Sequence, residues 1–141
     1  MTTLPFKVDF TDKVAVVTGG AGILCGAFVD ALAACGAKVA ILDRALEAAE
    51  KKAEEVRQKG GNAIGVEANV LDKESLKAAH AVVKEKLGLC DILINGAGGN
   101  HPLGTTTKEY LFPEDLNGQL KDTITFFDLD PEGVQFVFNL N

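Results

Sequence analysis

The sequence predicts an α/β fold in which helices cover both faces of a parallel sheet. Short apolar runs alternate with helix-length segments over residues 13–95. Continuous apolar runs are typical of strands buried on both faces, and connections of helix length lead to parallel pairing with right-handed crossovers. Residues 1–95 are therefore expected to form a β-α-β-α-β-α-β core.

Glycines and one capping residue set the expected boundaries. The strands are expected at residues 13–17, 38–42, 62–66 and 91–95. The helices are expected at residues 23–35, 45–59 and about 73–87. They end at Gly36, Gly60 and Gly88, where a left-handed cap favours glycine, and Asp72 is the expected N-cap of the third. The predicted apolar stripe of the first helix consists of Leu24, Phe28, Ala31, Leu32 and Cys35.

The composition changes from Gly96 onward. Residues 96–133 are rich in Gly, Thr, Pro, Asp and Asn, which predicts a long loop or insertion. A further helix is expected to begin near Pro131, because Pro and Glu suit a first turn, and to continue through residues 134–141. We interpret residues 1–141 as one Rossmann-type half-domain, a doubly wound sheet truncated after about four strands.

Composition and charge exclude several classes of protein. The chain has 141 residues, of which 47% are hydrophobic and 24% charged, as expected for one globular domain. A net charge of −6 argues against a nucleic-acid or anionic-membrane partner. The N-terminus lacks the pattern of a signal peptide, and no apolar run reaches a membrane span, so we expect a cytoplasmic protein. Cys25, Cys35 and Cys90 form no CxxC pair, so we expect free thiols and no metal site.

The segment after the first strand predicts a phosphate-binding turn. Gly19 and Gly22 have the spacing G-x-x-G, which lets the backbone approach a diphosphate without a Cβ in the way. The free N–H groups at the start of the next helix, at Ile23 and Leu24, can bind the negative charge. The alternative is an ordinary tight turn, because glycine motifs are common.

A carboxylate follows the second expected strand. Asp43 lies about 20 residues after the glycine turn, where an acid can accept hydrogen bonds from an adenosine ribose diol. The same charge repels a 2′-phosphate and favours NAD over NADP, although the neighbouring Arg44 weakens this preference. The alternative is a solvated aspartate at a strand end.

The glycine turn, the segment at Asn69 and Val70, and a motif that begins at Asn95 follow one another along the chain. In this order they resemble the motifs of the short-chain dehydrogenase/reductase family. The segment Thr18–Leu24 is similar to its cofactor turn, with Cys25 in the place of the last glycine. The resemblance implies that Asn69 and Val70 flank the adenine. The family's N-x-A-G motif is matched by Asn95, Gly96, Ala97 and Gly98. In the family, this asparagine steadies the central sheet, and the Ala-Gly backbone borders the nicotinamide-side ribose.

The resemblance also implies a catalytic set of Asn, Ser and Tyr-x-x-x-Lys. Asn141 matches the asparagine of this set. The only tyrosine, Tyr110, is followed four positions later by Glu114, and the only serine, Ser75, falls in the third expected helix. We therefore expect the 141-residue chain itself to be inactive. His101 could face the nicotinamide, although a solvent-exposed loop histidine is the favoured interpretation.

The resemblance implies an NAD(H)-dependent oxidoreductase that interconverts a secondary alcohol and a ketone. The motifs are similar to those of a subgroup that acts on sugar acids or polyols, and the complete protein is expected to form a homotetramer. Two alternatives remain open from the sequence. One is a non-catalytic dinucleotide-binding module, and the other is a methyltransferase that binds S-adenosylmethionine, which also has glycine turns and an acid after its second strand.

Overall fold

The computed structural model describes residues 8–117 and 122–141. The N-terminal segment considered above for a signal peptide falls mostly in residues 1–7, outside the described residues. The chain divides into two compact units, Met1–Ala97 and Gly98–Asn141. Each unit is described by itself.

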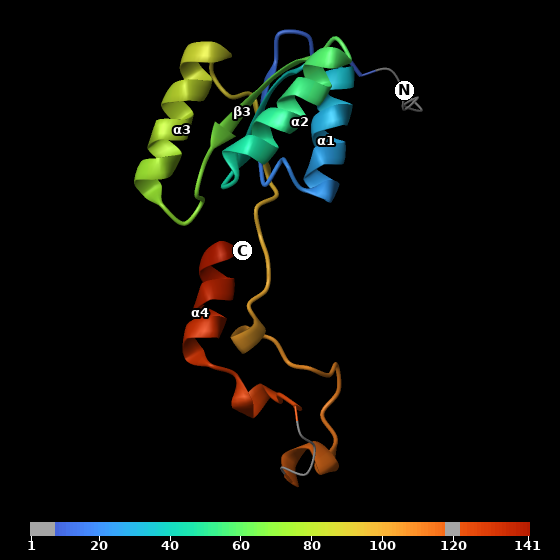
Figure 1. Cartoon of the computed structure of the whole chain (residues 1–141), viewed down its shortest axis with the longest axis vertical. Helices are drawn as coiled ribbons and strands as arrows, with labels where there is room; N and C mark the ends of the chain where they lie inside the picture. Colours follow the sequence, from blue (N-terminus) through green and yellow to red (C-terminus); the bar gives the residue numbers. More distant parts are fainter. Residues whose placement is uncertain (1–7, 118–121) are drawn as a thin grey trace. The chain divides into compact units, whose positions relative to one another are not determined.

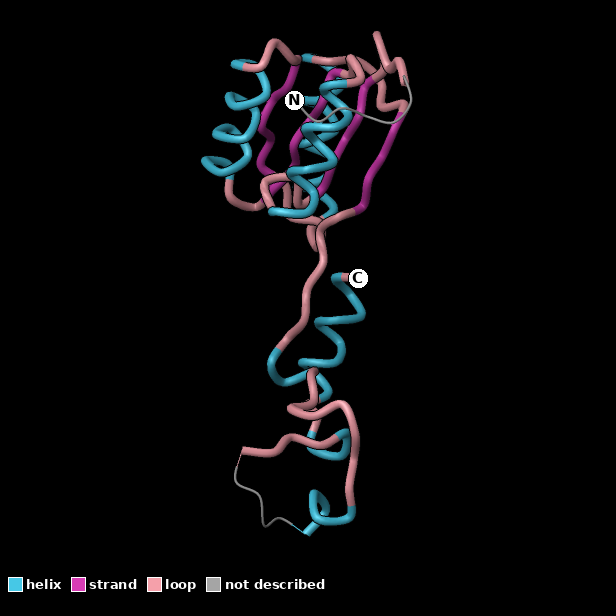
Figure 2. The backbone as a smooth tube through the Cα atoms, turned by 90° about the vertical axis from the view of Figure 1, so that its right-hand side faces the viewer, coloured by secondary structure: helices cyan, strands magenta, loops and turns pink. Residues whose placement is uncertain are grey.

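The first unit is a four-stranded parallel sheet with helical connections (Figures 1 and 2). Its strands are β1 (Val14–Thr18), β2 (Lys38–Asp43), β3 (Asn62–Glu67) and β4 (Ile92–Asn95). Its helices are α1 (Ile23–Ala34), α2 (Leu46–Gln58) and α3 (Lys73–Lys86). The strand order is β3-β2-β1-β4. This confirms the α/β Rossmann-type fold, and no end of a strand or helix differs from the expected one by more than one residue.

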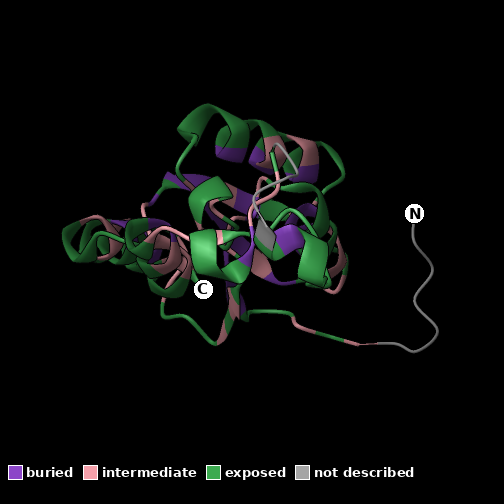
Figure 3. Cartoon of the chain, turned by 90° about the horizontal axis from the view of Figure 1, so that it is seen from below, coloured by how far each residue is buried: buried purple, intermediate pink, exposed green. Residues whose placement is uncertain are grey.

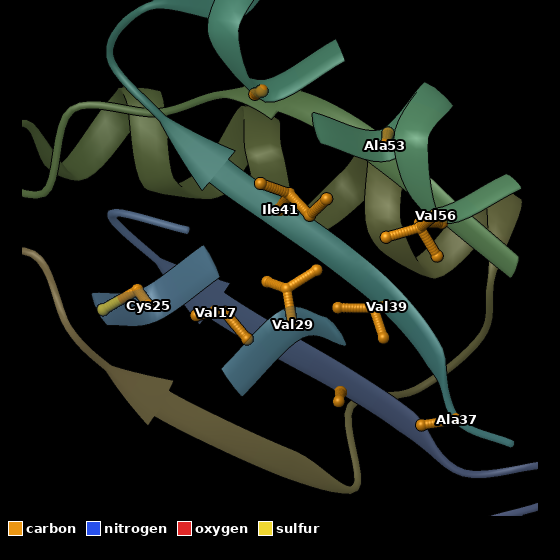
Figure 4. Close-up of a cluster of buried hydrophobic side chains, with 11 residues drawn as sticks. Val17, Cys25, Val29, Ala37, Val39, Ile41, Ala53 and Val56 are labelled. Carbon is orange, nitrogen blue, oxygen red and sulfur yellow. The ribbon is translucent and has the colours of Figure 1, made fainter. Parts of the chain in front are cut away.

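Two apolar layers hold the sheet between its helices. On one face, Val17, Val39 and Ile41 pack with Val29 of α1 and Val56 of α2 (Figure 4). On the other face, α3 covers the sheet with buried side chains, and that cluster consists of Val14, Val16, Ala40, Leu42, Val66, Ala68, Ala79 and Val83. The buried residues concentrate in the strands and the inner sides of the helices (Figure 3). The sheet is therefore wound on both faces.

The apolar stripe predicted for α1 is wrong in part. The buried residues of this helix are Cys25, Gly26 and Val29, whereas Leu24 is 70% and Phe28 41% exposed. The physical reason is that α1 is apolar on almost every side, with Asp30 as its only charged residue. Periodicity identifies an inner face only when the opposite face is polar.

The predicted helix ends of the first unit are confirmed. Gly36, Gly60 and Gly88 have φ values of +92°, +87° and +113°, in the region that favours glycine. The side chain of Asp72 accepts a hydrogen bond from the Glu74 amide at 2.9 Å and caps α3. The sequence predicts these helix ends because each glycine or cap interacts only with the adjacent turn of its own helix.

Asp91 connects the beginnings of β4 and β1. Its carboxylate accepts hydrogen bonds from the Val14 amide at 2.9 Å and from the Lys13 ammonium at 3.0 Å. The Val14 amide, followed by Lys13, holds the pKa of Asp91 below its usual value. The ionised carboxylate therefore stabilises the pairing of these strands.

Among its described residues, 98–117 and 122–141, the second unit contains one helix of regular length. The described part of the segment expected to be a loop holds three short 3₁₀ helices, η1 (Pro102–Gly104), η2 (Pro113–Asn117) and η3 (Phe126–Asp128). The helix α4 spans Pro131–Leu140, and the Asp130 side chain caps it by accepting from the Glu132 amide at 2.8 Å. A Cβ on Gly133 would lie 2.6 Å from the carbonyl carbon of Leu103, so η1 and α4 pack closely.

An ion pair between the exposed Lys108 and the buried Asp115 of η2 stabilises the loop between η1 and η2. The Asp115 carboxylate lies 2.6 Å from the Lys108 ammonium and accepts a hydrogen bond from the Phe112 amide at 2.9 Å. These contacts, with Lys108 the stronger, lower the pKa of Asp115. The loop is therefore ordered by its own polar contacts, while Phe112, Phe126 and Phe127 are exposed.

The close approach of α2 to β3 depends on Gly65. A Cβ at this position would lie 2.5 Å from the Glu50 nitrogen and 2.7 Å from the Ala49 carbonyl carbon. We expect Gly65→Ala to lower the free energy of unfolding by about 1–3 kcal/mol, because backbone atoms cannot move aside as a side chain can. Urea denaturation measures the change. Gly60→Ala is the control, since its Cβ would meet nothing within 4 Å and only the φ of +87° opposes it. An equal or smaller loss in Gly65→Ala would contradict the packing.

Candidate functional site

The glycine turn joins β1 to α1 and depends on the absence of side chains. Gly19 has a φ of +65°, and its carbonyl accepts a hydrogen bond from the Gly22 amide at 3.0 Å. A Cβ on Gly19 would lie 3.1 Å from the Gly96 oxygen and from backbone atoms of Ala97. Glycine is therefore required here for its conformation and for the contact with the loop after β4.

The first turn of α1 lacks a side-chain cap. Gly22 is the N-cap residue and has no side chain that could accept from the amides of this turn. These amides have no partner within the helix, and they carry the positive end of the helix dipole. Ile23 is 99% and Leu24 70% exposed, so the surface around the helix start is open. The arrangement suits a negatively charged group.

The Asp43 carboxylate lies beside the glycine turn. One oxygen accepts a hydrogen bond from the Ala21 amide at 3.3 Å, and the other accepts from the Ala45 amide at 3.1 Å. The structure thus brings together the turn and the acid that the sequence singled out. Each carboxylate oxygen can accept more than one hydrogen bond, so capacity for a diol remains. Arg44 is exposed and has no ion pair among the described residues.

Thr18 holds the loop after β4, a role that the motif comparison missed. Its hydroxyl oxygen accepts hydrogen bonds from the amides of Gly96 and Ala97 at 3.0 and 3.1 Å. It also lies 3.5 Å from the Ile94 carbonyl, to which it donates. The parallel pairing of β1 with β4 sets Thr18 opposite Asn95, and this register is the signal that could have revealed the contact.

Cys25 packs against the same loop. Its sulfur lies 3.7 Å from the Gly96 carbonyl oxygen. A Cβ on Gly96 would overlap this sulfur and would lie 2.9 Å from the Thr18 carbonyl oxygen. The cysteine therefore fits at the helix start because its neighbour in the loop is a glycine.

Asn69 and Ser75 form a polar turn after β3. The Asn69 side-chain oxygen accepts a hydrogen bond from the Leu71 backbone amide at 3.1 Å. The Asn69 backbone amide donates to the Ser75 hydroxyl at 2.9 Å. The oxygen of the Asn69 side chain is thus engaged, and its NH₂ group stays available as a donor. Ser75 positions Asn69, which sequence reasoning did not detect. Val70 beside it is half-buried.

Asn95 ends β4 with an exposed side chain. Within the part of the chain that the structure describes, this side chain makes no hydrogen bond, although the resemblance implies a sheet-steadying role. The Thr18 hydroxyl supplies the contact between the ends of β1 and β4.

The remaining site candidates lie in the second unit. The Asn141 side-chain amide donates to the Gly99 carbonyl at 2.9 Å, and its oxygen accepts from the Gly99 amide at 3.2 Å. A Cβ on Gly98 would lie 2.6 Å from this oxygen. His101 caps η1 by accepting from the Leu103 amide at 3.2 Å, and its ring centroid lies 5.1 Å from that of Phe136. Asn141 and His101 thus both make contacts that order the loop.

The described ranges 8–117 and 122–141 offer neither a metal-binding group nor a membrane span. No group of three or more His, Cys, Asp or Glu side chains there could hold a metal ion. No helix in these ranges is long and apolar enough to cross a membrane.

Comparison with known proteins identifies the family. The family model for short chain dehydrogenases matches residues 13–118. The chain belongs to this family. As a short-chain dehydrogenase, it contains the glycine turn and the loop after β4 within the matched range.

Similar proteins include oxidoreductases of two bacteria. An "Uncharacterized oxidoreductase" of Haemophilus influenzae is 46% identical over 133 residues, which cover 94% of this chain and 45% of that protein. The "Uncharacterized oxidoreductase UxuB" of Bacillus subtilis is 42% identical over 138 residues, 98% of this chain and 48% of that protein. The chain therefore spans about half the length of these curated relatives.

A solved structure has the same fold at high similarity. It is described as a "putative D-Mannonate oxidoreductase" from Haemophilus influenza "with bound NAD". It superposes with a TM-score of 0.86 at 42% identity, covering 94% of this chain and 46% of that chain.

The Thr18 hydroxyl should contribute measurably to stability. Thr18→Val keeps the β-branched shape but leaves the Gly96 and Ala97 amides without their acceptor. We expect a loss of about 1–3 kcal/mol in the free energy of unfolding, and faster hydrogen exchange at these two amides. Thr18→Ser retains the hydroxyl and is the control. If both variants were equally stable and exchanged alike, the hydroxyl would not hold the loop.

Proposed function

We propose that this short-chain dehydrogenase chain binds NAD(H) for an oxidoreductase that interconverts a secondary alcohol and a ketone. The observation that carries the proposal is the Asp43 carboxylate fastened to the glycine turn, 3.3 Å from the Ala21 amide. A solved relative described as having bound NAD supports the choice of cofactor. The substrate class that we propose for the complete protein is a sugar acid or polyol, in line with the description of that relative as a "putative D-Mannonate oxidoreductase".

The residues at the C-terminal edge of the sheet fit a dinucleotide. Gly19 and Gly22 carry no Cβ where the diphosphate would approach, and the uncapped first turn of α1 supplies amide donors. Asp43 would accept the hydroxyls of the adenosine ribose, with Arg44 beside it. The residues that we assign to the cofactor are Thr18, Gly19, Gly22, Ile23, Leu24, Asp43, Arg44, Asn69, Val70, Asn95, Gly96, Ala97 and Gly98.

The protein's part in the reaction is binding and orientation. NAD supplies the hydride acceptor when bound. The turn fixes the diphosphate through backbone amides, and the Thr18 hydroxyl fixes the Gly96–Ala97 backbone. Asn141, which we propose as a member of the catalytic set, orders the loop at Gly99.

A dinucleotide-binding module without catalytic activity is the second candidate for this chain. Tyr110 lacks a lysine four residues later, and the Ser75 hydroxyl accepts from the Asn69 amide in the turn after β3. The chain thus offers no tyrosine–lysine pair for proton transfer.

We expect the 141-residue chain to bind NAD but to show no turnover. The measurement is NADH absorbance during incubation with D-mannonate or gluconate, and a relative of full length tested in parallel serves as the control. A rate comparable with that of the control would contradict this expectation.

Removal of the Asp43 carboxylate should weaken NAD binding. Hydrogen bonds to a charged group are each worth about 1.5–3 kcal/mol, so we expect Asp43→Ala to raise the Kd for NAD about 10–100-fold. Titration calorimetry with NAD and NADP measures the change. Glu85→Gln, on an exposed position near the end of α3, is the control. Equal affinities for NAD and NADP, unchanged by Asp43→Ala, would refute the placement of the ribose.

A further inference from the structure

Asp43 has a second carboxylate as its neighbour on the adjacent strand. In the β2–β3 pairing, the Cα partner of Asp43 is Glu67, and both residues end their strands. Adjacent strands lie about 4.8 Å apart, and partners in register point to the same face of the sheet. Two residues earlier along β2, Ile41 packs in the cluster beneath α1 and α2, which places both carboxylates on that face.

Glu67 adds a negative charge to this edge. Its side chain is exposed and makes no ion pair among the described residues, and the same holds for Arg44. Asp43 and Arg44 together carry no net charge, so without Glu67 the strand ends would be neutral. The exposed Glu47 in the first turn of α2 adds to the negative side. The edge beside the proposed ribose position is therefore acidic despite the adjacent arginine.

We propose that Glu67 is a specificity-determining residue that opposes the 2′-phosphate of NADP and offsets Arg44. The inference rests on the proposed function, because it requires the ribose at Asp43. A 2′-phosphate carries up to two negative charges and would lie beside the two carboxylates. NAD has a neutral hydroxyl at this position, so Glu67 repels only its diphosphate, which would lie farther away at the glycine turn. Glu67 thus weakens the binding of NADP more than the binding of NAD.

The expected effect is modest and depends on salt. The Glu67 carboxylate is exposed, and a 2′-phosphate beside it would also contact water. The two groups would therefore interact as charges in a medium of high dielectric constant. We expect Glu67→Gln to tighten NADP binding about threefold at an ionic strength of about 0.01 M, where the Debye length is about 30 Å. At about 1 M salt the Debye length falls to about 3 Å and the difference should vanish. The Kd for NAD should change less than the Kd for NADP at low salt and should not change at high salt.

The test is calorimetric titration of the full chain with NAD and NADP in three forms: wild type, Glu67→Gln and Glu85→Gln. Glu85→Gln changes the net charge equally, but Glu85 lies in the last turn of α3, which runs back from the C-terminal edge of the sheet. Far-ultraviolet circular dichroism and an unchanged NAD affinity at high salt show that the variants are folded. The expected result is a salt-dependent gain in NADP affinity in Glu67→Gln alone.

Three results would overturn the proposal, and they are distinguishable from failure of the proposed function. An equal gain in both variants would assign the effect to net charge. A gain that persists at high salt would exclude the electrostatic cause. An unchanged NADP affinity in Glu67→Gln, with NAD binding still dependent on Asp43, would refute the role of Glu67 alone. If wild type bound neither dinucleotide, the proposed function would fail as well.

Discussion

The contact between the ends of β1 and β4 is the constraint on which the candidate site depends. The turn after β1 touches the Gly96–Ala97 backbone because Gly19 has no Cβ, and the Thr18 hydroxyl accepts from both amides of that loop. Cys25 at the start of α1 fills the remaining space beside Gly96. A side chain at either glycine would separate the two strand ends. The position of the helix start therefore follows from packing between two loops.

The helix starts of the chain differ in a way that bears on function. Asp72 and Asp130 cap α3 and α4 with side-chain oxygens that accept from first-turn amides. At α1 and α2, the N-cap residues Gly22 and Ala45 offer no such oxygen, and of these two helix starts only that of α1 follows the glycine turn. A side-chain cap would stabilise the helix by roughly 1 kcal/mol, but it would occupy the amides that an anion needs. The absence of a cap at this helix start is thus compatible with a ligand completing it.

The sequence predicted the alternation of elements in the first unit well, because the strands are short, mostly apolar runs and α1, α2 and α3 each end at a glycine. It did not predict the inner face of α1, since almost every position of that helix is apolar and Leu24 and Phe28 are exposed. Motif comparison identified Asp43 and the glycine turn as separate signals. Motif comparison did not identify the contacts of Thr18 and Ser75. Thr18 meets Gly96 because of the register of β1 and β4, and Ser75 meets Asn69 because the chain turns after β3. Local patterns therefore identify site residues more readily than the residues that hold them.

The Asp43 carboxylate serves two structural elements before any ligand binds. Its oxygens accept from Ala21 in the glycine turn and from Ala45 at the start of α2, so they are oriented in advance. A ribose that bonds to this carboxylate would also secure the turn that holds the diphosphate, since one residue contacts both. In the strand order β3-β2-β1-β4, the turn after β1 adjoins β2, and Asn69 follows β3 on the far side of Asp43. A dinucleotide bound in this order would place its base at β3, its ribose at β2 and its diphosphate at β1, and Asp43 would couple the last two.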